Sequence, residues 1–163
     1  DYQKDRLLSF ISPEKDPLGI GYNVIQSTIA VGSGQFFGRG LGRGTQSRLK
    51  FLPEFRTDFI FASIAEELGF VASLIVLTLY GVIISRGLMI ASNSDRFGTL
   101  LIVGVVGMIF FQVVVNIGMN IGLVPVTGIT LPLVSYGGSS LIVTLIALGI
   151  VQNIARQSKL LRF

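Results

Sequence analysis

The hydrophobic positions of this chain form three long runs that follow a charged N-terminal segment. Each run is long enough for a helix that crosses a bilayer, because about 20 apolar residues in a helix rise ~30 Å. Pro125 and Pro132 bracket a Gly/Thr-rich stretch where a helix should stop. A very hydrophobic soluble helical bundle is the less favoured alternative. The pattern predicts an all-α integral membrane protein, a polytopic helical bundle with transmembrane helices at 59–85, 99–123 and 133–155.

Composition agrees with a membrane protein and narrows the possible chemistry. Half of the 163 residues are hydrophobic and 13% are charged, whereas a soluble domain carries roughly 25% charged residues. The chain contains neither Cys nor His. This excludes a disulfide framework, a zinc site of the usual ligands, a Cys nucleophile and any catalytic relay that needs imidazole. The chemistry of the chain must use carboxylates, Lys or Arg, hydroxyls, amides or the backbone.

The basic residues around the connections predict the orientation. The link at 86–98 and the tail at 156–163 carry basic residues, and the turn at 124–132 carries no charge. By the positive-inside rule the link and the tail are cytoplasmic, and the turn is extracytoplasmic. Residues 1–58 then form a long extracytoplasmic loop with amphipathic segments, although they hold eight of the thirteen basic residues. Because no export signal precedes this loop, we expect the chain to be the C-terminal part of a longer polytopic protein.

The positive charge of the loop has two interpretations. It can attract anionic lipid or phosphate, or it can belong to a solvated loop whose acids are local partners. Six glycines fall within residues 32–44. Free backbone N–H groups there could approach a ligand closely, and Arg39 and Arg43 carry charge suited to a diphosphate. A flexible hinge between segments that rest on the bilayer is equally open, since no nucleotide-binding motif is complete here.

Carboxylates occur in three settings along the chain. Asp16 belongs to an Asp-Pro-x-Gly sequence, which is typical of an ordinary turn. Alternatively, the turn holds the Asp16 carboxylate on a rigid corner, where it could act as a general base or a metal ligand. Thr57 or Asp58 can cap the first transmembrane helix. Glu66 and Glu67 lie further into that helix, where an ionisable group is costly and more often lines a cavity or pairs with a buried cation.

Polar residues also interrupt the second and third apolar runs. Gln112, Asn116 and Asn120 recur every four residues, so they form one stripe on a helix. Their amides can bond across a helix interface, which favours packing over a substrate pathway. At the start of the third run, Ser135 and Ser139 stand among glycines and predict a second close-approach surface, at the outer face of the membrane.

The order of these motifs resembles the SEDS family (shape, elongation, division and sporulation) over essentially the whole chain. The motifs are Asp-Pro-Leu-Gly at 16–19, Gly-Thr-Gln-Ser at 44–47, Phe-Leu-Pro-Glu at 51–54, Thr-Asp-Phe-Ile-Phe at 57–61, Glu-Glu-Leu-Gly at 66–69 and Ser-Tyr-Gly-Gly-Ser-Ser at 135–140. Those at 44–47 and 51–54 are more similar to the rod-elongation branch of the family than to its division branch.

The resemblance implies a peptidoglycan glycosyltransferase of the bacterial cytoplasmic membrane, acting in cell-wall elongation and cell shape. It implies ten spans, of which this chain holds the last three, so the chain alone is expected to be inactive. Asp16 is the implied catalytic carboxylate, acting on lipid II alone or with a divalent cation such as Mg or Mn. A class B penicillin-binding protein transpeptidase is the implied partner, and no nucleic acid is expected.

The leaving diphosphate of such a reaction needs cations, and four basic residues of the loop are candidates: Arg39, Arg43, Arg48 and Lys50. Two other functions stay open for the same sequence. A lipid II flippase would need polar residues through the bilayer, which only the stripe of amides approaches. A non-catalytic scaffold of the elongation or division machinery would need no outer carboxylate.

Overall fold

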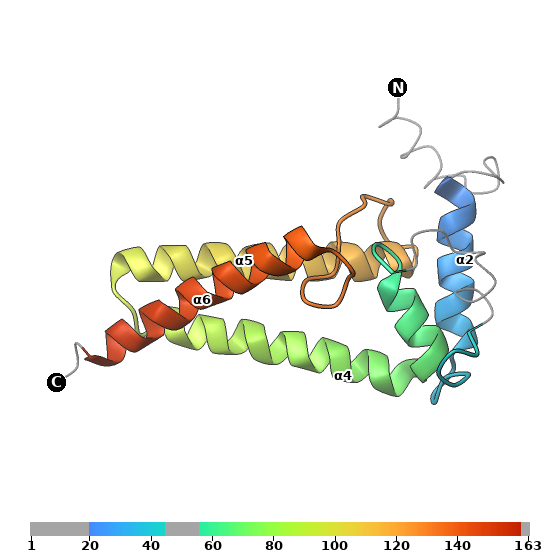
Figure 1. Cartoon of the computed structure of the whole chain (residues 1–163), viewed down its shortest axis with the longest axis horizontal. Helices are drawn as coiled ribbons and strands as arrows, with labels where there is room; N and C mark the ends of the chain where they lie inside the picture. The colour runs from blue at the N-terminus through green and yellow to red at the C-terminus, as the bar shows by residue number, and fades with distance from the viewer. Residues whose placement is uncertain (1–19, 45–55, 161–163) are drawn as a thin grey trace, which may run out of the picture.

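The computed structural model describes residues 20–44 and 56–160, and in this part the chain is helical and has no strand. The helices are α2 (Ile20–Ser33), α4 (Ile60–Ala91), α5 (Arg96–Asn120) and α6 (Gly138–Leu160). The three long helices run along the molecule, and α2 crosses them at the end where α4 begins (Figure 1). The expected all-α architecture is confirmed.

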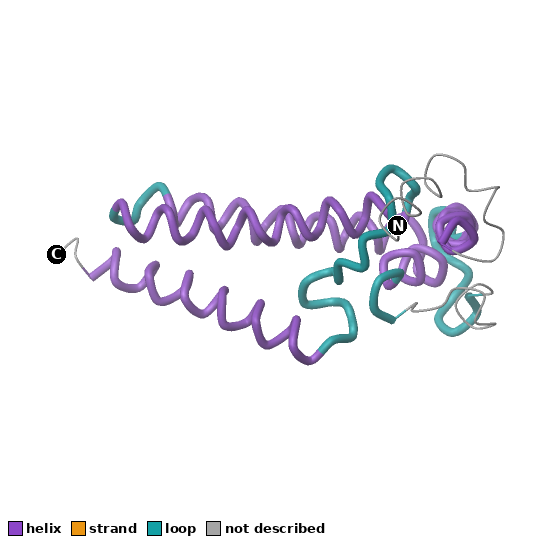
Figure 2. Tube along the Cα trace, turned by 90° about the horizontal axis from the view of Figure 1, so that it is seen from above, coloured by secondary structure: helices purple, strands orange, loops and turns teal. Residues whose placement is uncertain are grey.

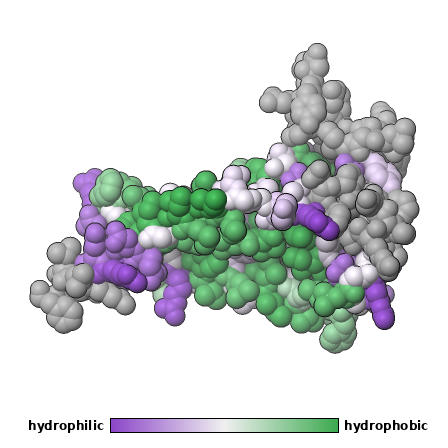
Figure 3. Space-filling model, viewed as in Figure 1, coloured by the Kyte–Doolittle hydropathy of each residue, from purple (hydrophilic) through white to green (hydrophobic). Residues whose placement is uncertain are grey.

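Helices α4, α5 and α6 are each long and apolar enough to cross a membrane. Large apolar side chains such as Leu79, Leu100 and Ile146 are more than half exposed along them, and apolar surface covers much of their length (Figure 3). A helix that exposes apolar side chains around most of its circumference is stable in hydrocarbon and not in water. The chain is therefore part of a multi-pass membrane protein.

The connection between α4 and α5 is shorter than expected. Helix α4 continues to Ala91, past the expected end at residue 85. Arginine is a good helix former and can extend its charged end toward water, so Arg86 does not end the helix. Asp95 then caps α5, since its carboxylate accepts a hydrogen bond from the Gly98 N–H at 3.2 Å. Helix α5 thus begins at Arg96 and not at residue 99.

Helix α6 begins at Gly138 and not at residue 133. The Leu131 carbonyl accepts hydrogen bonds from the N–H groups of Val134 and Ser135, at 3.3 and 2.9 Å, which closes a turn. Leu133 has a φ of 65°. A left-handed residue cannot continue a right-handed helix, so the connection from α5 extends to residue 137.

Helix α4 is bent sharply near its start, at Gly69, whose φ of 77° and ψ of −168° are not helical. Glycine has no Cβ and adopts this conformation without steric cost. The bend frees two N–H groups of the following turn, which bond to the segment after α2 instead. The Phe70 N–H donates to the Gln35 carbonyl at 2.8 Å, and the Val71 N–H donates to the Phe36 carbonyl at 3.2 Å.

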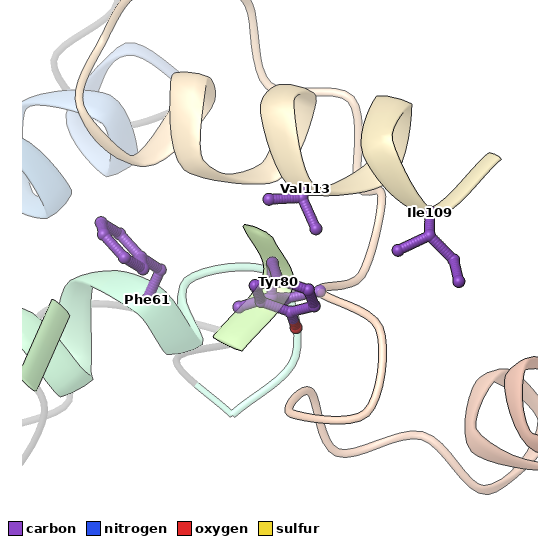
Figure 4. Close-up of a cluster of buried hydrophobic side chains, with 5 residues drawn as sticks. Phe61, Tyr80, Ile109 and Val113 are labelled. Carbon is purple, nitrogen blue, oxygen red and sulfur yellow. The ribbon is translucent and has the colours of Figure 1, made fainter. Parts of the chain in front are cut away.

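The main apolar cluster joins α4, α5 and the connection that follows α5 (Figure 4). It consists of Phe61, Tyr80, Ile109, Val113 and Leu131. The Tyr80 hydroxyl also donates a hydrogen bond to the Pro132 carbonyl. This hydrogen bond holds the connection against α4, because breaking it would leave the buried Tyr80 hydroxyl without a partner, at a cost in free energy.

Candidate functional site

The candidate residues divide between described and undescribed parts of the chain. Asp16, Arg48 and Lys50 lie outside the described residues, so their roles stay predictions. The others lie mainly around the bend of α4, the C-terminal end of α5 and the connection to α6. The described candidates therefore gather mainly at the end of the bundle that α2 crosses (Figure 1).

The glycine-rich turn, residues 34–44, docks on the bend of α4 through its backbone. The Arg39 N–H donates to the Glu66 carbonyl at 3.0 Å, and the Gly40 N–H donates to the Glu67 carbonyl at 2.9 Å. The expectation that the backbone here is free for a ligand is wrong for these two N–H groups. They satisfy carbonyls that the bend leaves without helical partners, as buried backbone groups require.

Both arginines of the glycine-rich turn have exposed side chains. Arg39 and Arg43 are exposed, and the Arg39 Nε donates to the Ser33 carbonyl at the end of α2 at 3.3 Å. Phe37 and Leu41 of the same turn are 86% and 76% exposed. The turn thus combines cations with apolar side chains, as expected of a segment in the headgroup region of a bilayer. Both arginines remain candidates for binding a diphosphate.

The two glutamates beside the bend have different environments. Glu66 is completely buried, whereas Glu67 is partly exposed. An acidic side chain is rarely buried unless it is bonded or neutral. Their backbone carbonyls hold the glycine-rich turn, and the two side chains remain candidates for a role in the cavity beside it.

The start of α4 is capped by another helix. Its N-cap residue is Phe59, which makes no side-chain cap hydrogen bond, whereas Thr57 or Asp58 was the expected cap. The Asn120 Oδ1 of α5 accepts a hydrogen bond from the Ala62 N–H at 3.1 Å. One of the first N–H groups of α4, which have no partner within the helix, is satisfied in this way.

Two residues of the amide stripe on α5 bind backbone groups. Asn116 and Asn120 are completely buried. The Asn116 Nδ2 donates to the carbonyls of Asp58 and Ile129 at 3.0 and 2.7 Å, and the Asn120 Nδ2 donates to the Asp58 carbonyl at 3.1 Å. The Gln112 Oε1 is buried but has no hydrogen-bond partner in the described structure. The asparagines therefore join three segments, while Gln112 does not.

Replacing Asn120 with Leu is expected to destabilise the full-length protein by about 1–3 kcal/mol, because it leaves the Ala62 N–H unpaired. The Asp58 carbonyl loses one of its two amide donors and keeps the Asn116 Nδ2. Gln112→Leu is the matched control in the same stripe. It removes an oxygen that has no partner and should be neutral or slightly stabilising. Thermal unfolding in detergent compares the two variants. An equal loss of stability in both would contradict this role of Asn120.

The two candidate serines near the start of α6 differ in their contacts. The Ser135 Oγ donates to the Thr57 carbonyl at 2.6 Å and accepts from the Leu131 N–H at 2.8 Å. Ser135 therefore ties the turn before α6 to the segment that enters α4. Ser139 is exposed in the first turn of α6.

An apolar cavity of about 740 Å³ opens beside the bend, between α2, α4 and α5. Phe36 and Phe70 stand on its wall with their rings edge to face, 6.1 Å apart. Its described lining contains no charged residue, so it suits a hydrocarbon chain better than a sugar or a phosphate. The sequence gives no sign of this cavity, because nothing in the local pattern of its residues shows how α2, α4 and α5 pack around it.

A metal site is not built within the described residues. No group of three or more acidic side chains lies close enough there to hold an ion. Calcium and magnesium need several oxygen ligands, and the described residues do not supply such a set.

Comparison with known proteins identifies the family. A family model described as "Cell cycle protein", for FtsW, RodA and SpoVE, matches residues 1–160. The chain is 53% identical over 162 residues to the peptidoglycan glycosyltransferase MrdB of Escherichia coli K12, covering 99% of this chain and 44% of that protein. It is 51% identical over 158 residues to the peptidoglycan glycosyltransferase RodA of Treponema pallidum, covering 96% of this chain and 36% of that protein.

Solved structures agree with these matches. A chain of a peptidoglycan synthase complex superposes with a TM-score of 0.73 at 43% identity, covering 96% of this chain and 42% of that chain. A variant of the rod shape-determining protein RodA of Thermus thermophilus superposes with a TM-score of 0.60 at 37% identity, covering 85% of this chain and 50% of that one. The chain spans less than half the length of these curated relatives. Sequence, fold and motif order together show that the chain belongs to the FtsW/RodA/SpoVE family, the SEDS proteins.

Proposed function

We propose that the full-length protein containing this chain is a peptidoglycan glycosyltransferase that polymerises lipid II in cell-wall elongation and shape maintenance. The observation that carries this proposal is the 53% identity to a curated peptidoglycan glycosyltransferase over 99% of the chain. Activity, substrate and partner belong to the whole protein, because this chain corresponds to 44% of that relative.

In the proposed reaction Asp16 is the general base. The 4-hydroxyl of the GlcNAc of one lipid II molecule attacks the anomeric carbon at the end of the growing strand. Asp16 accepts the hydroxyl proton as the new glycosidic bond forms, and the bond to undecaprenyl diphosphate breaks. The proposal places residues 1–58 and this reaction outside the membrane, with the C-terminus in the cytoplasm, as the distribution of basic residues predicts.

The described residues support the binding of the leaving group. Arg39 and Arg43 lie on the glycine-rich turn, and Gln35 and Phe36 of the same turn line the apolar cavity. A diphosphate at the arginines would thus have an apolar cavity nearby for its hydrocarbon chain. Arg48 and Lys50 complete the proposed set of cations.

A cation and a protein partner are further parts of the proposal. A divalent cation, Mg or Mn, would act through Asp16 and other residues outside the described part, so no step of the reaction is assigned to the cation. The proposed partner is a class B penicillin-binding protein transpeptidase. It is supported by the similarity to a chain of a peptidoglycan synthase complex.

The test is the reaction of labelled lipid II with the purified full-length protein and its transpeptidase partner in liposomes. We expect glycan strands on a gel. Loss of these strands when EDTA chelates divalent cations would show that the reaction needs such a cation. If lipid II moves between the leaflets and no glycan strands form, the protein is a flippase and not a glycosyltransferase. If neither strands nor movement occurs while the two proteins still associate, the scaffold function is the correct one.

A further inference from the structure

A second apolar cavity, of about 320 Å³, lies near the other end of the bundle, between α4, α5 and α6. We call it the three-helix groove. Val82, Ile109 and Leu148 line it toward the middle of the helices, and Arg86 and Gln152 line it closer to the helix ends. The groove therefore has an apolar part and a polar part, arranged along the direction that crosses the membrane.

Helix packing explains why the groove is there. A Cβ on Gly87 would lie 2.4 Å from the Val106 Cγ2, so α4 and α5 touch closely at this level. Val151 of α6 joins Ala91 and Val106 in one buried cluster. From this cluster α6 diverges from the other two helices toward its own N-terminus (Figure 2). The three helices are thus in contact at this cluster, and α6 separates from α4 and α5 beyond it. Residues of all three helices line the groove of about 320 Å³ that remains between them.

Arg86 is an unusual residue in this setting. It stands five residues, or ~7.5 Å, before the end of α4, and Leu88 and Met89 beyond it are 49% and 60% exposed. The Arg86 guanidinium is exposed and makes no hydrogen bond or ion pair with any residue that the structure describes. Such a cation extends toward the water interface, where lipid phosphates lie and can supply a counter-charge.

The charges nearby also favour an anion. The ionisable residues of this end are Arg86, Asp95, Arg96, Arg156 and Lys159, the last known only by its place in α6. The Asp95 carboxylate accepts a bond from the Gly98 N–H at the start of α5, and the tail at 156–163 contains no acid. Hydrophilic side chains gather at this end of the molecule, at the left of Figure 3.

We propose that the three-helix groove binds one anionic glycerophospholipid. Its phosphodiester oxygens accept hydrogen bonds from the Arg86 guanidinium, and the Gln152 amide donates to the same headgroup. One acyl chain follows the apolar part of the groove along Val82 and Leu148. A zwitterionic lipid would bring an ammonium group toward these arginines and should bind more weakly.

Native mass spectrometry of the full-length protein, released from vesicles of phosphatidylglycerol and phosphatidylethanolamine, tests this site. We expect retained phosphatidylglycerol to exceed retained phosphatidylethanolamine by about ten-fold. Arg86→Gln should remove that preference. Arg156→Gln, which changes another exposed arginine at the same end of the bundle but does not line the groove, should keep it.

A second variant covers the case in which Arg86→Gln does not fold. Val82 lines the groove and is half exposed in the described structure, so Val82→Trp can be accommodated while the indole fills the apolar part of the groove. It should lose the bound lipid with Arg86 still present. Equal retention of the two lipids by the wild type, or full retention of phosphatidylglycerol in Val82→Trp, would overturn the proposal. Cross-linking of Leu148 to a helix of another protein would overturn the proposal as well, because the groove would then be occupied by that partner.

Discussion

Replacing Asp16 with Asn is expected to abolish glycan-strand formation by the full-length protein while leaving it folded in the membrane. The amide has nearly the shape of the carboxylate but cannot accept the proton of the attacking hydroxyl. A positioned general base contributes roughly 10²–10⁴-fold to a rate, so the loss should be at least ~100-fold. The measurement is the rate of lipid II polymerisation by equal amounts of wild-type and variant protein with the transpeptidase partner.

The control for this variant is Asp5→Asn, which removes another aspartate from the same N-terminal segment. It should polymerise lipid II at close to the wild-type rate. If Asp16→Asn also makes strands at that rate, Asp16 is a turn residue of the Asp-Pro-x-Gly sequence and the base lies elsewhere. The glycosyltransferase function would survive that result, because the wild-type assay tests it separately.

Replacing Gly34 with Ala should strongly destabilise the docking of the glycine-rich turn on α4. Gly34 is buried, and a Cβ added there would lie 1.8 Å from the carbonyl oxygen of Ala65. The obstacle is backbone of the bent helix, which cannot move aside like the end of a flexible side chain. Overpacking of this kind costs about 3 kcal/mol. We expect a clearly lower temperature of thermal unfolding and easier proteolysis within the turn.

Gly32→Ala is the matched control, two positions earlier near the end of α2. No atom lies within 4 Å of the Cβ that it would add. Alanine also reduces the entropy of the unfolded chain, so this variant should be neutral or stabilised by about 0.4–1 kcal/mol. Unchanged unfolding and proteolysis in Gly34→Ala, measured beside this control, would show that the turn does not depend on close backbone contact.

The membrane architecture could be predicted from the sequence because it depends on a local property. An apolar run of about 20 residues crosses a bilayer whatever its neighbours are. The helix ends were less predictable, since charge alone does not decide them. Arg86 lies within α4, and Leu133 lies outside α6 because the turn at Leu131 closes first.

The motifs were predictable as a pattern, but their physical roles were not. The glycines after α2 suggested a ligand cradle, yet the N–H groups of Arg39 and Gly40 bind carbonyls of α4. Nothing in the local sequence shows that the helix bends at Gly69 and exposes those carbonyls. The catalytic role of Asp16 rests on the family motif, because that residue lies outside the described structure.

The sequence by itself determined the class of protein, the presence of three apolar runs long enough to cross a membrane and the family, because run length and motif order are read along the chain. Only the tertiary structure decided which polar groups have partners. The Asn120 side chain caps the start of α4 by accepting from the Ala62 N–H, 58 residues earlier in the sequence. The two apolar cavities likewise depend on how α2 and α6 pack against α4 and α5. Contacts between distant segments follow from the packing of whole helices, which no local pattern of residues specifies.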